Sequence, residues 1–156
     1  TWIASKLVGR WPSGAPLTLT PDRDDPTLAS AKDFLYQRQD ALGMRCPIGA
    51  HIRRTNPRDS LEPRPGSQDS LAVNRRHQIL RRGRSYGPAC PIPDVGASVL
   101  EHRDAMLDRG LHFICLNANI ARQFEFVQAS WVNNPQFGNL SDDVDPLIGR
   151  RGRFST

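Results

Sequence analysis

One histidine lies in a segment that is rich in small residues and arginines. His51 stands in the stretch CPIGAHIRRTNPRD, which runs from Cys46 to Asp59. A neutral imidazole can ligate a metal through one ring nitrogen when a hydrogen bond holds the other nitrogen. The commoner role of a lone histidine in such a setting is a surface residue or a support for a nearby site. The local sequence leaves both readings open, so the rest of the chain decides between them.

Arginine supplies nearly all of the positive charge, and it gathers in clusters. The formal net charge is +5, and Lys6 and Lys32 are the only lysines. A guanidinium group is planar and permanently protonated, so it suits carboxylates, phosphates and developing negative charge. The clusters at 53–58, 75–84 and 150–153 would also fit a basic nucleic-acid-binding module. No zinc pattern, recognition helix or aromatic-interleaved motif accompanies them, which makes this the lesser alternative.

The composition is that of one globular domain. The 156 residues are 38% hydrophobic and include thirteen prolines and twelve glycines, so loops are expected to be extensive. No apolar run approaches the roughly 20 residues of a membrane span, and no membrane partner is expected. Cys46, Cys90 and Cys115 show no metal or disulfide spacing, which favours a reducing, cytoplasmic setting. Because the chain begins with Thr1, an internal piece of a longer protein is expected, and export stays open.

Periodicity and turn residues predict an α+β arrangement. Short helices or strands are expected at 2–8 (helix), 33–36 (strand or turn) and 77–87 (strand), and 55–72 is expected to be an exposed loop. The apolar run 110–117 is typical of a largely buried strand. An amphipathic helix follows, with Asn117 or Asn119 as its N-cap and Asn133-Asn134-Pro135 at its end. Its apolar face is expected to carry four residues: Ile120, Phe124, Val127 and Trp131.

Several separated segments resemble the dye-decolourising (Dyp-type) heme peroxidases. They are KLVGRWPSGAPL at 6–17, CPIGAHIRRTNPRD at 46–59, ILRRGRSYGP at 79–88, GLHFICLNANIARQFEFVQASWVNNPQF at 110–137 and DPLIG at 145–149. One such match is weak, whereas several in the same order are specific. The resemblance covers most of the chain and implies a ferredoxin-like antiparallel sheet with packed helices.

The resemblance assigns roles to particular residues. It implies that His51 is the proximal ligand of the iron in heme b (iron protoporphyrin IX). Asp145 matches the acidic residue that holds the other ring nitrogen of that ligand; a turn or cap residue before Pro146 is the alternative. Arg81 matches the distal arginine, whose fixed charge would orient peroxide and stabilise the charge on the leaving oxygen.

Other residues near these motifs receive weaker assignments. Leu111 and Phe113 fall where apolar residues cover the distal side of the heme, although core packing explains them equally well. One of the arginines Arg53, Arg54 and Arg58 is expected to pair with a heme propionate, without a choice among them. The remaining histidines, His77, His102 and His112, have no motif behind them and are not expected to be ligands.

The implied function is a heme-dependent peroxidase that uses hydrogen peroxide to oxidise bulky organic donors such as dyes and phenols. The family's Gly-x-x-Asp-Gly segment, whose aspartate acts as acid and base towards peroxide, does not occur here. Residues 1–156 therefore resemble a C-terminal heme-binding portion, with the N-terminal half and final tail expected elsewhere or on a partner chain. A homo-oligomer stays open. The alternative is a heme-binding protein or truncated relative without efficient peroxidase turnover.

Overall fold

The computed structural model describes residues 1–88, 108 and 110–150. Cys90 and His102, which entered the sequence analysis, lie outside these residues. The chain divides into two compact units, and each is described by itself. The first consists of Thr1–Gln78 together with the described part of Asn119–Thr156, and the second is the described part of Ile79–Ala118.

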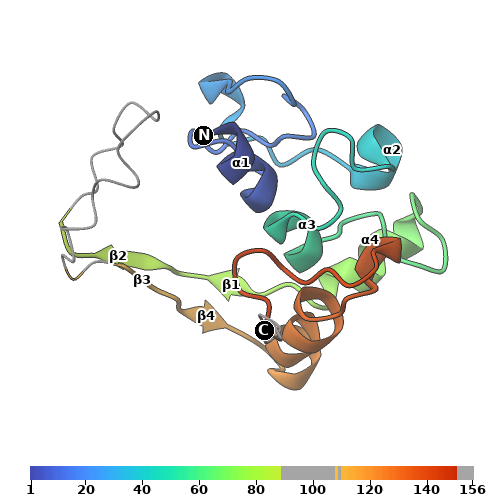
Figure 1. Ribbon diagram of the computed structural model, residues 1–156. Coiled ribbons are helices and arrows are strands. Elements are labelled where there is room, and N and C mark those ends of the chain that lie inside the picture. Colours follow the sequence, from blue (N-terminus) through green and yellow to red (C-terminus); the bar gives the residue numbers. More distant parts are fainter. Residues whose placement is uncertain (89–107, 109, 151–156) are drawn as a thin grey trace, which may run out of the picture. The chain divides into compact units, whose positions relative to one another are not determined.

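The first unit is built from short helices joined by long loops (Figure 1). Its helices are α1 (Trp2–Val8), η1 (Pro26–Leu28), α2 (Tyr36–Asp40), α3 (His51–Thr55), α4 (Gln68–Arg75), η3 (Ala121–Glu125), η4 (Val127–Val132) and η5 (Phe137–Asn139). None of the helices in the described ranges is long and apolar enough to cross a membrane. The dominance of loops follows from the density of proline and glycine in the sequence.

Helix α1 confirms the prediction for residues 2–8, and it ends where glycine permits a sharp turn. Gly9 adopts a left-handed conformation with φ 96°, and its N–H donates to the carbonyl of Ser5. A side chain at Gly9 would also collide with Ile52 of α3. Glycine is therefore required at this position both by the turn and by the close approach of α1 to α3.

Two predictions for the loops of the first unit are wrong in detail. Residues 55–72 were predicted to be an exposed loop, but α4 begins at Gln68. The hydroxyl of Ser67 accepts a hydrogen bond from the N–H of Ser70 at 3.2 Å and caps this helix. Residues 33–36 do not form a strand; Leu35 is extended and precedes α2. Helix α4 thus starts at a local side-chain cap, whereas α2 starts after extended Leu35 without one, and apolar periodicity signals neither start.

The first unit has two apolar clusters. One is formed by Trp11, Ala15, Leu17, Phe34, Tyr36, Cys46 and Ala50. The other is formed by Val127, Trp131, Val132 and Phe137. Burying each large apolar side chain contributes about 1.5–3 kcal/mol. Helix α3 packs against η4, which carries most of the second cluster, so the helix that begins with His51 has a firm support.

The predicted helix after residue 119 is present, but its turns are wider than those of an α-helix. The N–H of Glu125 donates to the carbonyl of Ile120, and Asn133 donates to Gln128, each five residues back. The cap is Asn119, whose side chain accepts from the N–H of Arg122 at 2.9 Å. Val127 and Trp131 are buried as predicted, and the helix ends before Asn133.

One member of the predicted apolar face is misplaced. Ile120 precedes the first helical turn and is 60% exposed. The prediction assumed a period of 3.6 residues over the whole segment. Hydrogen bonds that reach five residues back widen the turns and change the angular spacing of the side chains, so the first residue of the stripe leaves the buried face.

The second unit consists of two short antiparallel pairs (Figure 1). Strand β1 (Leu80–Arg81) pairs with β4 (Cys115–Leu116), and β2 (Arg84–Tyr86) pairs with β3 (Gly110–His112). In the register, Arg81 lies opposite Cys115 and Arg84 lies opposite His112. Helices and antiparallel strands thus coexist in the chain, and the predicted α+β class is confirmed.

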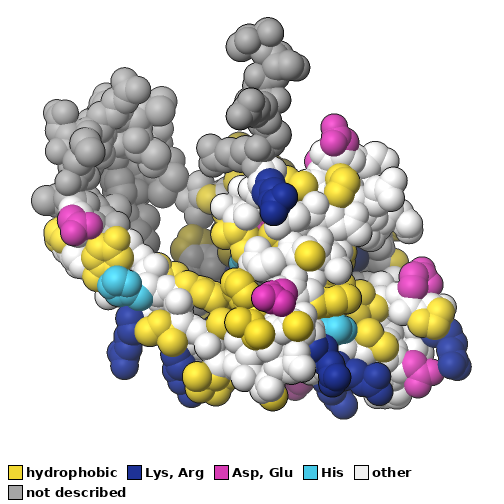
Figure 2. All heavy atoms as spheres, turned by 90° about the horizontal axis from the view of Figure 1, so that it is seen from below, with side chains coloured by type: hydrophobic (Ala, Val, Ile, Leu, Met, Phe, Trp, Pro, Cys, Tyr) yellow, Lys and Arg dark blue, Asp and Glu magenta, His cyan; other side chains and the backbone are white. Residues whose placement is uncertain are grey.

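Two strand predictions need correction. The strand predicted for residues 77–87 starts at Leu80 and is interrupted at Arg82-Gly83, where the N–H of Arg82 donates to the carbonyl of Ile114 at 2.7 Å. The run 110–117 is not buried, because Leu111 is 65% and Phe113 is 53% exposed. An isolated pair of strands leaves both of its faces uncovered within its own unit, which periodicity cannot foresee. Figure 2 shows that hydrophobic side chains reach the surface on the face drawn there.

Candidate functional site

The candidate site begins at the N-terminal end of α3. His51 is the first residue of this helix and follows Ala50, which is 1% exposed and belongs to the first apolar cluster. The carbonyl of His51 accepts a hydrogen bond from the hydroxyl of Thr55 at 2.8 Å. The backbone of His51 is therefore fixed, and its ring is 19% exposed at the surface of the unit.

The ring of His51 is held by a carboxylate far along the chain. Its Nδ1 lies 2.9 Å from Oδ2 of Asp145, whose side chain is fully buried. The other carboxylate oxygen of Asp145 accepts the N–H groups of Leu147 and Ile148 at 2.9 and 3.0 Å. The N–H of Asp145 donates to the carbonyl of Val132 at 2.9 Å, which ties the turn to η4. Asp145 is thus a rigid acceptor aimed at the imidazole.

The same contacts set the charge of Asp145. Burial by itself would raise the pKa of this carboxyl. The hydrogen bonds from His51 and from the N–H groups of Ile148 and Leu147 outweigh burial, and the pKa of Asp145 lies below its ordinary value. An ionised carboxylate only accepts hydrogen bonds, so Nδ1 of His51 carries a proton.

That tautomer leaves the second ring nitrogen available. In the neutral ring, Nε2 of His51 has a free lone pair, and no residue in the described part of the chain forms a hydrogen bond with it. The described residues contain no group of three or more His, Cys, Asp or Glu side chains that could hold a metal ion together. The arrangement therefore fits a single axial nitrogen ligand whose metal is carried by another group.

The arginines beside His51 prove to be structural. Arg53 donates to the carbonyls of Asp40 and Cys46 at 2.9 Å, and it forms an ion pair with the carboxylate of Asp40 at 3.2 Å. Arg54, with no exposed surface, donates to the carbonyls of Trp131, Asn134 and Asp143 at 2.8, 3.1 and 2.6 Å. Both guanidinium groups are bonded in the interior, and only Nε of Arg54 is buried without a partner among the described residues.

Arg58 is also bound to backbone. It donates to the carbonyls of Lys32 and Phe34 at 2.8 and 3.0 Å, and its guanidinium lies 3.7 Å from the centre of the Phe34 ring. Both of these bonds use one guanidinium nitrogen of Arg58, so Arg58 keeps donors that Arg53 and Arg54 spend on interior carbonyls. The pairing of one of the three arginines with a propionate stays a prediction. The structural roles of these arginines could not be predicted from the sequence, because buried backbone carbonyls have no sequence signature.

The remaining predicted site residues belong to the second unit. Arg81 is exposed at the end of β1, Leu111 is exposed in β3, and Phe113 follows that strand. Arg82 and Gly83 lie between β1 and β2, outside both strands. The distal roles of Arg81, Leu111 and Phe113 stay predictions.

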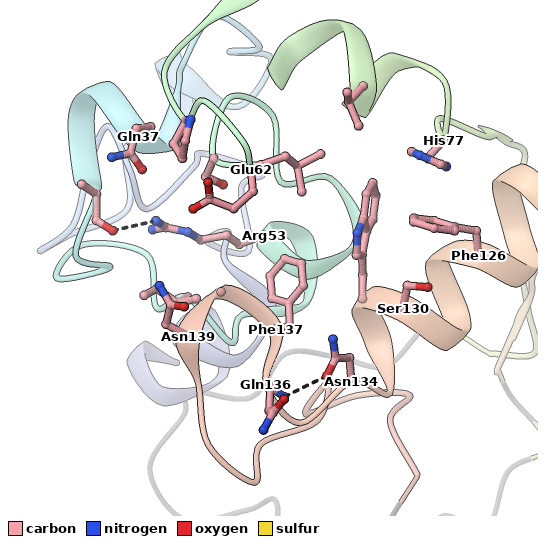
Figure 3. A pocket seen from close by; sticks show the side chains of 18 of the residues that line it. Gln37, Arg53, Glu62, His77, Phe126, Ser130, Asn134, Gln136, Phe137 and Asn139 are labelled. Atoms are coloured by element: carbon pink, nitrogen blue, oxygen red, sulfur yellow. Dashed lines mark hydrogen bonds between the residues drawn. The ribbon is translucent and has the colours of Figure 1, made fainter. Parts of the chain in front are cut away.

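A cavity of about 780 Å³ lies in the first unit, but His51 is not among its lining residues. Figure 3 shows His77 beside Phe126 at one end of it, and Gln37, Arg53 and Glu62 towards the other end. The rings of His77 and Phe126 stack at 4.0 Å, and Nδ1 of His77 lies 2.6 Å from the carbonyl of Arg122. The absence of a motif around His77 gave no sign of this packing role.

No family model matches the chain. Individual relatives match nearly all of it. Dye-decolorizing peroxidase msp1 of Mycetinis scorodonius is 38% identical over 158 residues, covering 98% of this chain and 29% of the relative. Multifunctional dye peroxidase DyP2 of Amycolatopsis sp. (strain ATCC 39116 / 75iv2) is 39% identical over 153 residues, covering 94% of this chain and 31% of the relative.

Solved structures agree with these relatives. The crystal structure of a Dyp-type peroxidase of Anabaena sp. superposes with a TM-score of 0.77 at 31% identity, covering 96% of this chain and 30% of that one. DyP2 from Amycolatopsis sp. ATCC 39116 gives a TM-score of 0.75 at 36% identity, covering 96% and 31%. This chain is related to the Dyp-type peroxidases.

The similarity to the Dyp-type peroxidases covers only part of their length. The chain spans about three tenths of the length of the Dyp-type peroxidases that it matches. A deferrochelatase of Yersinia pestis bv. Antiqua (strain Nepal516) also matches, at 33% identity over 116 residues, covering 74% of this chain and 19% of the relative. The Dyp-type peroxidases are heme enzymes. His51 and Asp145 together fit heme. One imidazole nitrogen of His51 can bind the iron, and the carboxylate of Asp145 holds the other nitrogen.

Proposed function

We propose that residues 1–156 are the C-terminal heme-binding portion of a Dyp-type peroxidase. Such an enzyme uses hydrogen peroxide to oxidise bulky organic donors, including dyes and phenols. The observation that carries the proposal is the hydrogen bond between Nδ1 of His51 and the buried carboxylate of Asp145, which lie 2.9 Å apart. It occurs in a chain similar over nearly its whole length to dye-decolorizing peroxidases.

In this proposal His51 binds the iron of heme b through Nε2. When bound, heme b supplies the redox chemistry with peroxide. Asp145 keeps the imidazole in one tautomer and one orientation, and its negative charge makes Nε2 a stronger donor. The two N–H groups that hold Asp145 prevent the carboxylate from turning away from the ring.

The distal side is assigned by the motif ILRRGRSYGP. Arg81 would orient peroxide and stabilise the negative charge on the leaving oxygen, because its guanidinium stays protonated at any working pH. Leu111 and Phe113 would limit the access of water to this side, and both are exposed within the second unit.

The partners and setting follow from the same proposal. Hydrogen peroxide and an organic electron donor are the substrates, and the rest of the heme pocket comes from the parts of the protein that correspond to the remaining length of its relatives. Cys46 and Cys115 are free thiols, which supports a reducing compartment such as the cytoplasm.

The test is a hemin titration of the 156-residue chain, followed by absorption in the Soret region. His51→Ala is compared with His112→Ala, which removes an exposed imidazole in β3. We expect the wild type and His112→Ala to form the same complex, and His51→Ala to bind at least about 10-fold more weakly because the axial bond is lost. Equal binding by all three would contradict the assignment of His51.

A second candidate is heme binding without efficient peroxidase turnover, which the match to a deferrochelatase favours. Turnover of a dye by the loaded chain, compared with the same concentration of free hemin, separates the two. A peroxidase should exceed free hemin, and Arg81→Gln should remove most of the excess. A chain that holds heme and yet does not exceed free hemin would support the second candidate.

A further inference from the structure

A second cavity of the first unit, of about 550 Å³, is lined by an excess of positive charge. It lies between the segment 32–39, the chain just after α3, and α4. Its lining includes the basic side chains Lys32, Arg38, Arg58 and Arg75, and a single carboxylate, Asp33. No proposed role in heme binding uses this cavity.

None of these cations forms an ion pair with a carboxylate among the described residues, although Asp59 attracts Arg58 from a longer distance. The ion pairs in the described part of the chain join His51 to Asp145, Arg53 to Asp40, and Arg64 to Asp69, so none involves a cation of this cavity. Like charges that share a cavity repel one another, and the repulsion is relieved when an anion binds among them. The charge distribution therefore favours an anionic ligand.

One of the cations is already fixed in position. Arg58 is held by the carbonyls of Lys32 and Phe34, and its guanidinium lies over the Phe34 ring. Burial lowers the pKa of Arg58, which means that the protein leaves its charge incompletely solvated. A guanidinium that is oriented before binding loses little conformational entropy when it meets an oxoanion.

A buried acceptor gives a second, independent indication of a ligand. Asn74 lines the cavity and is 3% exposed. Its Nδ2 donates to Oδ1 of Asn56 at 2.8 Å, whereas its Oδ1 is buried without a hydrogen-bond partner among the described residues. A buried acceptor left unpaired costs about 1–3 kcal/mol. This oxygen has almost no accessible surface, so a ligand hydroxyl removes that cost when the Asn74 side chain turns towards the cavity.

Part of the cavity wall is apolar, which indicates that the ligand also has an apolar part. Leu35 and Leu71 line the cavity and are half-buried. From the cations, the unpaired amide oxygen and this apolar wall, we infer that the cavity binds a hydroxylated aromatic carboxylate. The carboxylate lies among Arg58, Arg75 and Lys32, and the hydroxyl donates to Oδ1 of Asn74. This binding does not require heme, so it can fail or succeed independently of the peroxidase proposal.

The test is isothermal titration calorimetry of the 156-residue chain with three small compounds. 4-Hydroxybenzoate carries both the charge and the hydroxyl, benzoate lacks the hydroxyl, and 4-hydroxybenzyl alcohol lacks the charge. We expect 4-hydroxybenzoate to bind with a dissociation constant below about 1 mM. Each of the other compounds should bind roughly 5-fold or more weakly, because each loses one polar contact.

A matched pair of charge variants locates the site. Arg75 and Arg76 are neighbours at the end of α4 and both are exposed, but only Arg75 lines the cavity. We expect Arg75→Gln to raise the dissociation constant of 4-hydroxybenzoate roughly 3- to 10-fold, and Arg76→Gln to change it less than about 2-fold. Equal effects would mean that only the net charge matters, which would overturn the proposed site.

Two further outcomes would also overturn the inference. One is no detectable binding of 4-hydroxybenzoate by a wild-type chain that gives a cooperative unfolding transition. The other is loss of that binding when the chain is loaded with hemin, because the cavity would then serve a heme propionate. Binding that persists with hemin and weakens in Arg75→Gln supports it.

Discussion

At the scale of single residues, the candidate site depends on one long-range pair. His51 and Asp145 are separated by 94 positions, and the bond of 2.9 Å between them distinguishes His51 from an ordinary surface histidine. Asp145 in turn is held by the two N–H groups that follow Pro146. The orientation of the His51 ring is therefore set by a carboxylate that the local sequence around it does not contain.

The first residue-scale prediction concerns Asp145→Asn. An amide can still accept the N–H groups of Leu147 and Ile148, but its acceptor oxygen is then used and Nδ1 of His51 loses its partner. We expect the variant to lose about 1–3 kcal/mol in the free energy of unfolding and to bind hemin roughly 10- to 100-fold more weakly. Urea denaturation and the Soret titration measure the two effects. Asp143→Asn, in an exposed residue whose carbonyl rather than carboxylate contacts Arg54, is the control.

The second prediction is the pH dependence of the same pair. Because the pKa of Asp145 is lower in the folded chain than in the unfolded one, its contribution to stability is present above the unfolded value of about 3.9. The contribution disappears as the pH falls through the lowered folded value. We expect the stability difference between the wild type and Asp145→Asn to be constant above about pH 5 and to shrink below it. A difference that grows on acidification would contradict the sign of the shift.

The third prediction concerns Cys46, which is fully buried in the first apolar cluster. Burial raises the pKa of this thiol to about 12. At pH 8 the reactive thiolate of Cys46 is therefore scarce, whereas Cys115 is only half-buried. We expect iodoacetamide to modify Cys46 at least about 100-fold more slowly than Cys115 in the native chain, and equally fast in urea. Peptide mass spectrometry measures both rates.

At the scale of elements, buried arginines connect the short helices of the first unit. Arg53 ties α3 to the end of α2 and to Cys46, and Arg54 ties α3 to η4 and to the loop that leads to Asp145. Helix α3 is only five residues long and would not be stable by itself. The position of His51 thus rests on guanidinium–carbonyl bonds.

The fourth prediction tests that role with Arg54→Met, which keeps most of the volume but removes the donors. Three carbonyls lose a charged partner in the interior, so we expect the free energy of unfolding to fall by about 3 kcal/mol or more. Arg64→Met removes an exposed arginine that pairs with Asp69, and it should change stability by less than about 1 kcal/mol. Similar losses in the two variants, measured in urea, would contradict the role of Arg54.

At the scale of the whole molecule, the chain separates into a unit with apolar clusters and a unit of short strand pairs. A two-stranded pair is marginally stable in water. The exposure of Leu111, Phe113 and Leu116 shows that the second unit does not bury its own apolar residues.

The fifth prediction follows from this difference. We expect amide hydrogens in β1 to β4 to exchange at least about 100-fold faster than those of α3 in the 156-residue chain, because local opening of the strand pairs costs little free energy. Hydrogen exchange followed by mass spectrometry measures this. Equal protection in both segments would show that the two units open together.

The sequence by itself determined the parts of the chain whose causes are local. Helix 2–8 with its terminal glycine, the cap at Asn119 and the stop before Asn133 each depend on a few neighbouring residues. The ordered motifs also identified the family, and they named His51 and Asp145 before any distance was known.

Only the tertiary structure decided which arginine side chains are used in hydrogen bonds that hold the fold together and which are exposed. Arg53 and Arg54 are adjacent to His51 in sequence, yet their partners are carbonyls supplied by distant segments. The apolar run 110–117 is exposed within its unit although its composition is that of a buried strand. Burial and hydrogen bonding depend on which segments meet in space, and hydrophobic periodicity records only how each segment would pack if a partner were present.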